Sequence, residues 1–394
     1  MNLLMVSGDR QVVIGERGPF WSMQRHFSTF FGRIDVLVPG PGAEVVTDTI
    51  HGNVHFHVGP EGRAAMPAWI ASRGAELLAE HRHGLVVSHD YGTFYNGRGA
   101  ARLSRATGVP LVSELHHIPG HPVASGAVER LEKLMARLYV RWARRHVRAF
   151  RVVNETETPA LLRRWGVPED RIAVLPSQYL DFDVFRPSEG PSCEGPSGEG
   201  SSGEVYRVAE RDVVFVGRMA ANKGVDRILD ALARCAGQGR TYRATFVGKG
   251  PERERWMARA RQLGLGDSTE WIEWIAEPAQ LADVYRTSRV CVCASTCEGG
   301  PRFTVEAMAC EVPVISTPVG VMTDLLADGA AGRLTGFDAA SLAAALDDVL
   351  GDEARRRGLG AEAARRVQPF EYHAALERYA RGLIDLAGGE GAPA

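Results

Sequence analysis

Residues 295–320 read STCEGGPRFTVEAMACEVPVISTPVG and show the pattern of an α/β fold. They follow the apolar run Val290–Cys293, turn at Gly-Gly-Pro and continue with the residue pattern of a helix that includes Glu306. A second apolar run, Val314–Ser316, comes next. A strand, a helix and a strand in this order predict a right-handed βαβ unit of a parallel sheet.

Apolar runs of the same kind recur along the whole chain, each followed by a polar or Gly-rich turn and a helical pattern. In the first half they are Leu3–Ser7, Ile34–Val38, Val54–Val58, Leu85–Ser88, Pro110–Ser113, Phe150–Val153 and Ile172–Leu175. The second half adds Val213–Val216, Ala244–Val247 and Trp271–Ile275 before the two runs named above. Continuous apolar runs suit strands that helices cover on both faces. The sequence therefore predicts an α/β fold of two Rossmann-like, doubly wound domains that face a central cleft, where parallel sheets bind ligands.

A segment of unusual composition separates the two sets of runs. Residues 187–204, PSEGPSCEGPSGEGSSGE, contain only Pro, Ser, Glu and Gly apart from Cys193, which predicts a flexible linker. It divides the chain into an N-terminal domain, 1–186, and a C-terminal domain, 205–368. Residues 369–394 are expected to form an amphipathic helix over Pro369–Leu386, which packs back on the N-terminal domain, and a tail.

Composition excludes several classes of protein. The 394 residues carry a net charge of −2, which argues against nucleic acid as a partner. No apolar run approaches the ~18 residues of a membrane span and no leader is recognisable, so a cytoplasmic protein is expected. The six cysteines form no C-x-x-C pair, which argues against a zinc site.

Charged residues follow the predicted strands of the second half. FVGRMAANKG places Arg218 and Lys223 after one strand, FVGKGP adds a Gly-x-Gly turn after the next, and Glu298 follows a third, eight positions before Glu306. A diphosphate needs cations, and a carboxylate can accept two vicinal hydroxyls. Lys223 is notable because only three of the 46 basic residues are lysines. The pattern favours a site for a phosphorylated sugar compound over chance surface charges.

The order strand-GR-x4-KG, strand-VG-x-G-P and E-x7-E resembles the retaining glycosyltransferases of family 4, which have the GT-B fold. The resemblance implies that Arg218 and Lys223 hold the donor diphosphate, Glu298 contacts the sugar and Glu306 contacts the ribose. It also implies that the backbone near the base and the sugar lines the donor site, at Gly217, Ile275, Gly299 and Gly300. The chain departs from the family where Pro301 follows Glu298-Gly299-Gly300, because proline donates no backbone hydrogen bond.

The N-terminal half offers weaker signals. Gly15 and Gly18 resemble the glycines of the family's first loop, which lies against the diphosphate. His89 and Asp90 follow one predicted strand, and His116 and His117 follow another. The family often has a catalytic-site histidine near donor sugar and acceptor, and His116 matches it best; His89, Asp90 and His117 are candidates for the acceptor region.

Two further segments suggest interactions. Residues 129–151 hold eight basic and two acidic residues on a helical pattern, which fits either a solvated helix or peripheral contact with the inner face of a membrane. The motif Asp181-Phe182-Asp183 resembles a metal-binding D-x-D, but it lies beside the linker. GT-B enzymes take their cations from side chains, so we expect no metal and no cofactor.

These patterns predict a metal-independent, retaining glycosyltransferase that moves a hexosyl or N-acetylhexosaminyl group from a nucleotide sugar to an acceptor hydroxyl. The expected donor is UDP-linked, with a GDP-mannose-dependent mannosyltransferase as the alternative; the acceptor is a glycan, a lipid-linked compound or a small metabolite. A non-catalytic sugar-nucleotide-binding protein is the rival from another class. An NAD-dependent oxidoreductase fits poorly, because the turn at Gly248-Lys249-Gly250 lacks the third glycine of the dinucleotide fingerprint.

Overall fold

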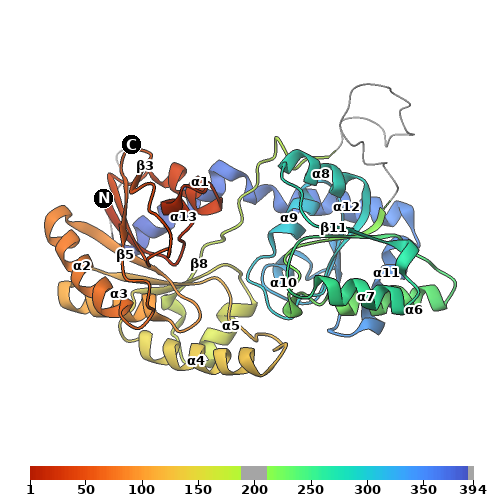
Figure 1. Ribbon diagram of the computed structural model, residues 1–394, viewed down its shortest axis with the longest axis horizontal. Helices are drawn as coiled ribbons and strands as arrows, with labels where there is room; N and C mark the ends of the chain where they lie inside the picture. Colours follow the sequence, from red (N-terminus) through yellow and green to blue (C-terminus); the bar gives the residue numbers. More distant parts are fainter. Residues whose placement is uncertain (188–210, 389–394) are drawn as a thin grey trace. The chain divides into compact units, whose positions relative to one another are not determined.

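The structure, a computed structural model, describes residues 1–187 and 211–388. Apart from Pro187, the predicted linker lies outside the described residues. The chain divides into two compact units, the first made of Met1–Tyr179 and the C-terminal segment from His373, the second of Leu180–Tyr372. Each unit is an α/β domain with its own largely parallel sheet, as the apolar runs predict (Figure 1).

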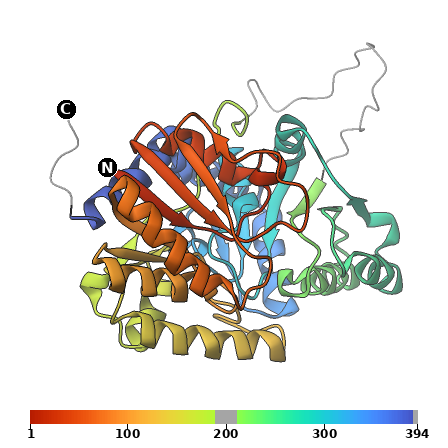
Figure 2. The same cartoon turned by 60° about the vertical axis from the view of Figure 1, so that its left-hand side comes forward.

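The first unit contains an eight-stranded sheet in the order β3-β4-β2-β1-β5-β6-β7-β8. Its strands are β1 (Asn2–Val6), β2 (Arg33–Val38), β3 (Thr49–Ile50), β4 (Val54–Val58), β5 (His83–His89), β6 (Leu111–Leu115), β7 (Ala149–Val152) and β8 (Ile172–Val174). All neighbours pair in parallel except β3 and β4. Helices pack on both faces (Figures 1 and 2): α1 (Pro19–Phe27), α2 (Met66–His81), α3 (Tyr95–Thr107), α4 (Ala127–Ala143), α5 (Glu157–Arg164) and α13 (Tyr372–Leu386).

The second unit has a six-stranded parallel sheet in the order β11-β10-β9-β12-β13-β14. The strands are β9 (Arg211–Val216), β10 (Ala244–Val247), β11 (Thr269–Ile272), β12 (Ser288–Cys293), β13 (Val314–Ser316) and β14 (Gly332–Leu334). The helices are α6 (Val225–Gly237), α7 (Arg253–Gln262), α8 (Pro278–Arg286), α9 (Arg302–Ala309), α10 (Met322–Leu325), α11 (Ala339–Leu350) and α12 (Glu353–Val367). On one face α6 contacts α7 and α11, and on the other α9 contacts α8 and α12 (Figure 1).

Both sheets reverse their strand order at one place. In the first unit β1 lies between β2 and β5, and in the second β9 lies between β10 and β12. The loops that leave the carboxyl ends of β1 and β5, or of β9 and β12, therefore lead to helices on opposite faces. Parallel sheets bind ligands at such switch points.

The apolar runs locate every long strand, with ends that differ by at most two residues except at β11, where the run Trp271–Ile275 ends three residues beyond the strand. The sequence analysis missed β3 and β14, which are two and three residues long at sheet edges and carry little apolar signal. The first unit ends at Tyr179 and not at the expected Arg186, because Leu180 and Phe185 pack in the core of the second unit. The C-terminal helix belongs to the first unit, where Tyr379 packs edge-on against Phe27 with ring centroids 5.0 Å apart.

The expected basic helix over 129–151 needs correction. Helix α4 ends at Ala143, and Arg151 lies in strand β7, where it is fully buried. Arg151 is therefore a core cation and not part of the exposed basic surface of this helix.

Candidate functional site

In the second unit, two glycine-containing loops pack backbone against backbone at the ends of β9 and β10. The amide of Gly217 donates to the carbonyl of Val247 (2.9 Å), and the amide of Met219 donates to that of Lys249 (2.7 Å). A Cβ on Gly248 would lie 1.9 Å from the Gly217 oxygen. The glycines of the VG-x-G turn thus allow this close approach, and the loop that carries Arg218 is held in place by it.

Lys223 and Glu298 form an ion pair across the switch point. Lys223 ends the short 3-10 helix Ala221–Lys223 after β9, and Glu298 follows β12. The Lys223 Nζ contacts Glu298 Oε1, and the Ser295 hydroxyl donates to the same oxygen at 2.9 Å. Only 16% of the lysine side chain and 14% of the glutamate side chain are exposed. The fold therefore brings two residues that are 75 positions apart in the sequence into direct contact. The sequence motifs place both residues in one donor site, and the contact is consistent with that prediction.

The backbone holds this ion pair in place. The Thr296 amide donates to the Asn222 carbonyl at 2.9 Å. Gly224 has a φ of +67°, and a Cβ there would lie 2.0 Å from the Ala294 oxygen. The loops after β9 and β12 are consequently fixed to each other on both sides of Lys223.

Arg218 differs from Lys223. Its side chain is exposed, and no carboxylate of the described residues lies within ion-pair distance of it. A guanidinium with five donors and no carboxylate partner is suited to bind an anion. The loop after β9 therefore carries Lys223, which is paired with a carboxylate, and Arg218, which has no carboxylate partner among the described residues.

Glu306 lies on α9 and is only 6% exposed. Arg302 Nε donates to its Oε1 at 2.8 Å, and the Tyr285 hydroxyl donates to its Oε2 at 3.1 Å. Desolvation raises the pKa of Glu306 above its usual value, although Arg302 and Tyr285 oppose this. Each carboxylate oxygen keeps one lone-pair site, since a carboxylate offers about four and two are used.

The turn between Glu298 and α9 is built from Gly299, Gly300 and Pro301. The Gly299 carbonyl accepts from the Val321 amide at 2.9 Å, which ties this turn to the loop after β13. Pro301 is the N-cap residue of α9, and its φ of −66° is the value that the proline ring imposes. Ile275 follows β11, and its partly buried side chain packs against the core of the second unit.

In the first unit, a pocket of about 530 Å³ lies at the carboxyl ends of the strands. It is lined by Ser7, Gly8, Asp9, Pro19, Phe20, Met23, His89, Asp90, Tyr91, His116, His117, Ser177, Tyr179 and Tyr379. All four acceptor-region and histidine candidates are thus gathered in one pocket. Gly15 and Gly18 are not among its lining residues; Gly8 takes the position next to β1, where a Cβ would lie 1.4 Å from the Tyr91 hydroxyl oxygen.

A buried charged cluster forms one wall of this pocket, and the sequence analysis did not find it. Glu114, at the end of β6, is fully buried and lies 3.5 Å from Arg151, 3.1 Å from His89 and 3.6 Å from His116. The Tyr379 hydroxyl of α13 donates to Glu114 Oε1. Burial alone raises the pKa of Glu114, but Arg151 and His89 outweigh it and hold the pKa well below its usual range. The available signal was a glutamate directly after the apolar run Pro110–Ser113, at a position that proves to belong to strand β6.

His116 faces the pocket with 46% of its side chain exposed. Desolvation of its buried side lowers the pKa of His116 below the usual value, against the opposing effect of Glu114. The imidazole is therefore neutral at pH 7 and keeps a nitrogen that accepts a hydrogen bond from a hydroxyl. The ring of His89 packs edge-on against it, with centroids 5.8 Å apart.

Asp90 has a different environment from the one expected for an acceptor-binding carboxylate. Its Oδ2 accepts hydrogen bonds from the hydroxyls of Ser88 (2.9 Å), Tyr139 (2.7 Å) and Ser113. The residue is 2% exposed, and desolvation raises its pKa to about 6 despite these hydroxyls. Asp90 therefore supports the pocket floor, with Oδ1 unpartnered in the described residues.

No group of three or more His, Cys, Asp or Glu side chains in the described ranges is placed to hold a metal ion. Asp181 Oδ1 instead accepts from the Asp183 amide at 2.9 Å within a turn. Metal independence stays a prediction.

We predict that Asp90 makes stability depend on pH. Burial raises the pKa of Asp90 in the folded protein to about 6 from the usual 3.8, so the protonated carboxyl stabilises the fold below about pH 4, and this contribution is lost as pH rises to about 6. The full difference is on the order of 3 kcal/mol. Urea unfolding from pH 4 to 7 should therefore show the wild type losing stability relative to Asp90→Asn. Asp267→Asn, at an exposed position, is the control. If the difference in unfolding free energy between wild type and Asp90→Asn stays constant with pH, the raised pKa of Asp90 is contradicted.

Comparison with known proteins agrees with this architecture. The family model "Glycosyl transferase 4-like domain" matches residues 31–178, and "Glycosyl transferases group 1" matches 205–366. A D-inositol 3-phosphate glycosyltransferase of Kineococcus radiotolerans is 30% identical over 376 residues, 86% of this chain and 82% of the relative. A D-inositol 3-phosphate glycosyltransferase of Segniliparus rotundus is 30% identical over 264 residues, 64% of this chain. This chain spans about half (55%) of the length of that relative.

Solved structures show the same fold. A sucrose-phosphate synthase of Thermosynechococcus elongatus superposes with a TM-score of 0.76 at 20% identity, covering 98% of this chain and 99% of the other. HepE of Anabaena, solved in complex with UDP and glucose, gives a TM-score of 0.71 at 20% identity, covering 98% and 100%. The chain has two Rossmann-like units and an E-x7-E block whose first glutamate pairs with a lysine. Together with the matches above, these features establish that the chain belongs to the family 4 glycosyltransferases of the GT-B fold.

Proposed function

We propose that this protein is a retaining glycosyltransferase that moves a hexosyl or N-acetylhexosaminyl group from a UDP-linked donor to an acceptor hydroxyl. The observation that carries the proposal is the contact of Lys223 with Glu298 at the switch point of the second sheet. In this proposal the Lys223 ammonium binds the leaving diphosphate, and the carboxylate of Glu298 beside it accepts hydrogen bonds from the sugar hydroxyls. The complex of HepE with UDP and glucose supports a uridine nucleotide, with GDP-mannose as the alternative donor.

The reaction we propose needs no protein nucleophile. The acceptor oxygen attacks the anomeric carbon from the face that the diphosphate leaves, so the C–O bond to the acceptor forms as the bond to phosphate breaks. The hydroxyl proton passes to the departing phosphate oxygen. Arg218 and Lys223 stabilise the negative charge that develops on the diphosphate, and the protein contributes mainly positioning and this electrostatic stabilisation.

In this proposal the two glutamates hold different parts of the donor. Glu298 accepts hydrogen bonds from sugar hydroxyls while it remains beside Lys223. Glu306 accepts the two ribose hydroxyls through the lone-pair sites that Arg302 and Tyr285 leave open. The backbone of Gly217, Gly299, Gly300 and Ile275 completes the donor site.

The acceptor, in our proposal, occupies the first-unit pocket with its reactive hydroxyl near His116. The described lining includes histidines, tyrosines, serines and the carboxylates of Asp9 and Asp90, and it includes no lysine or arginine. Such a lining suits hydroxyl groups and offers no permanently charged side chain to pair with a phosphate. We therefore propose an uncharged polyhydroxyl acceptor, whether free, part of a glycan or lipid-linked, although relatives are named for an inositol phosphate.

The test is a turnover assay with UDP- and GDP-sugars against free polyols and their phosphate esters, read out as nucleoside diphosphate release. We expect release with a UDP-sugar, preference for the unphosphorylated polyol, full activity in EDTA and an α-linked product from an α-linked donor by NMR. A β-linked product contradicts retention. Loss of activity in EDTA that a divalent ion restores contradicts metal independence. Donor binding with no turnover across the panel supports the non-catalytic alternative.

A second prediction concerns Glu306→Gln, which keeps size and helix propensity but removes the charge. Hydrogen bonds to a charged group contribute about 1.5–3 kcal/mol against about 1 for neutral ones, so UDP affinity should fall about five- to thirtyfold. Calorimetric titration with UDP and with its 2′,3′-dideoxy analogue measures the effect. The analogue lacks the hydroxyls, so its affinity should hardly change; equal losses for both ligands place Glu306 away from the ribose.

A further inference from the structure

Helix α4 exposes a row of large apolar side chains. Its exposed members are Val128, Leu131, Leu134, Leu138 and Trp142, with Leu138 at 61% and Leu131 at 58% exposure. From Leu131 onward they are spaced three, four and four residues apart, so they share one side of the helix. Other exposed apolar side chains of the described residues are scattered over separate loops and strand ends.

This row is not the face that packs on the protein. Ala136, Tyr139, Val140 and Ala143 are the buried residues of α4 and belong to the core of the first unit. The helix is thus apolar on two sides, and only one of them is covered within the first unit. An uncovered row of four to five large apolar residues is typical of an interaction surface.

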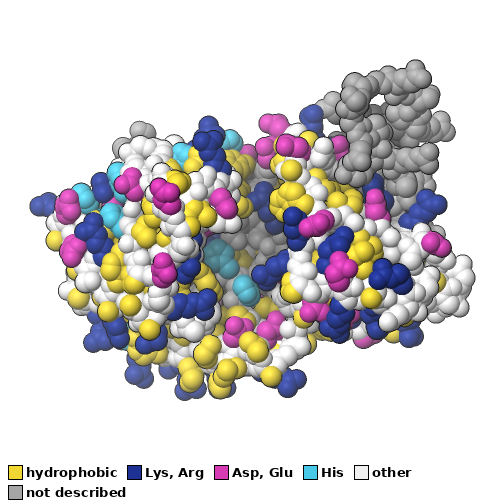
Figure 3. Space-filling view, in the orientation of Figure 1, with side chains coloured by type: hydrophobic (Ala, Val, Ile, Leu, Met, Phe, Trp, Pro, Cys, Tyr) yellow, Lys and Arg dark blue, Asp and Glu magenta, His cyan; other side chains and the backbone are white. Residues whose placement is uncertain are grey.

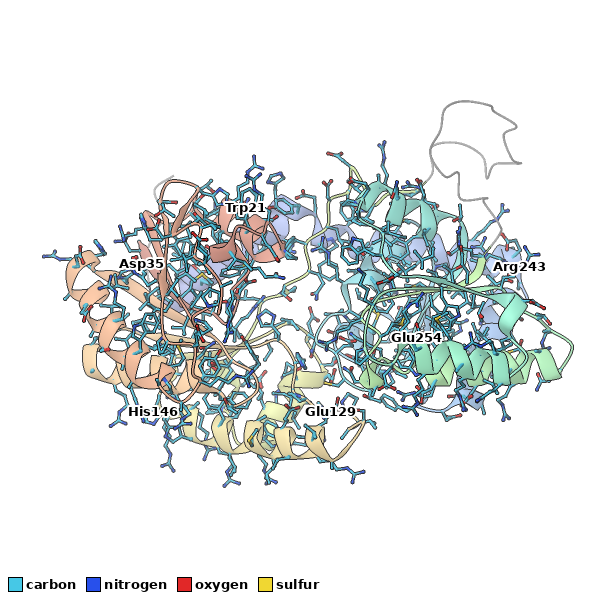
Figure 4. The ribbon with its side chains drawn as sticks, in the orientation of Figure 1. Trp21, Asp35, Glu129, His146, Arg243 and Glu254 are labelled. Atoms are coloured by element: carbon cyan, nitrogen blue, oxygen red, sulfur yellow. The ribbon has the colours of Figure 1, made fainter. Side chains whose placement is uncertain are left out.

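Arginines lie next to the apolar row. Arg130, Arg137 and Arg141 are exposed and spaced seven and four residues apart, which places them on one line along the helix. Arg145 and Arg148 are exposed just beyond its end. Figure 3 shows the hydrophobic atoms along the lower edge of this unit with basic side chains beside them, and Figure 4 labels Glu129 and His146 at the two ends of the helix.

The acidic residues of α4 do not balance these arginines. Glu129 and Glu132 lie in the first two turns and are partly buried, and Glu129 accepts a hydrogen bond from the Ser125 amide at 2.6 Å. Lys133 is turned toward the protein, where it donates to the Gly120 carbonyl at 3.0 Å. The exposed surface beside the apolar row is therefore cationic over the second half of the helix.

We propose that α4 docks on the surface of an anionic lipid bilayer. Leu131, Leu134, Leu138 and Trp142 enter the boundary between headgroups and acyl chains, and Arg130, Arg137 and Arg141 contact the lipid phosphates. Basic amphipathic helices that lie in the membrane plane have this combination of an apolar row and flanking cations. No helix in the described part of the chain is long and apolar enough to cross a membrane.

Charge favours a lipid surface over a second copy of this chain. A symmetric dimer through α4 must be self-complementary, so the arginine line of each copy would need acidic residues on the α4 of the other copy, and no exposed acidic row on α4 supplies them. An anionic bilayer supplies that complement along the whole helix. The proposed membrane docking is separate from the proposed transfer reaction, and its test uses no activity measurement. The docking proposal and the proposed function can therefore fail independently.

The experiment measures co-sedimentation of the full chain with two kinds of vesicle, phosphatidylcholine alone and equal parts phosphatidylglycerol and phosphatidylcholine. We expect binding to the anionic vesicles, weakened by salt. Leu131→Ser/Leu138→Ser should weaken partitioning by at least about tenfold, because two exposed leucines lose apolar contact. The exposed pair Val45→Ser/Val46→Ser is the matched control and should bind as wild type does.

A charge variant separates the electrostatic part. Arg130→Gln/Arg137→Gln/Arg141→Gln should lose up to about a hundredfold at low salt. Arg255→Gln/Arg357→Gln/Arg365→Gln removes the same charge from exposed arginines of the second unit and should lose little. The proposal is overturned if wild type does not bind anionic vesicles, or if the α4 variants bind them as well as the control variants do. It is also overturned if the protein forms a dimer without lipid, Leu131→Ser/Leu138→Ser dissociates that dimer, and no vesicle binding is observed.

Discussion

The ion pair of Lys223 with Glu298 is the contact on which the second unit's site depends. It forms because β9 is the strand where the sheet order reverses, so the loop after it meets the loop after β12. The hydrogen bond of Thr296 to Asn222 and the contact of Gly224 with Ala294 hold those loops together. The carboxylate of Glu298 stabilises the mostly buried ammonium of Lys223, and under the proposed function a bound diphosphate shares that ammonium with Glu298. Arg218 is exposed on the same loop, and in the proposed function it supplies the additional positive charge.

The first unit repeats the topology with different chemistry. Its switch point between β1 and β5 carries Gly8, His89 and Asp90, and the pocket there rests on the buried pair of Glu114 and Arg151. Removing one partner of a buried ion pair typically costs about 3–5 kcal/mol, so Glu114 constrains the pocket wall as well as the two histidines beside it. Tyr379 brings the C-terminal helix into the same cluster, which explains why that helix belongs to the first unit.

Much of this arrangement is predictable because it rests on short-range patterns. Apolar runs locate the strands, and the spacing of Glu298, Glu306, Arg218 and Lys223 relative to those strands predicts that they gather at one end of the sheet. Glu114, Arg151 and Tyr379 escaped prediction for a physical reason: each is stabilised by partners far away in sequence. The basic neighbours of Arg151 in sequence predict an exposed basic helix over 129–151, whereas Arg151 lies in β7 and its buried partner is Glu114. The exposed apolar row of α4 likewise cannot be predicted from the sequence, because α4 is apolar on two sides and only the structure shows which side is buried.

The most direct test of the account compares binding of a nucleoside diphosphate and its nucleoside to wild type, Lys223→Met and Glu298→Gln by calorimetry, using the base of the best donor. If Lys223 holds phosphate and Glu298 competes for it, Lys223→Met weakens the diphosphate about tenfold or more and leaves the nucleoside unchanged. Glu298→Gln then binds the diphosphate more tightly than wild type, since the competing carboxylate is gone. Unchanged diphosphate affinity in Lys223→Met, or weaker binding in Glu298→Gln, would contradict the central role of this ion pair.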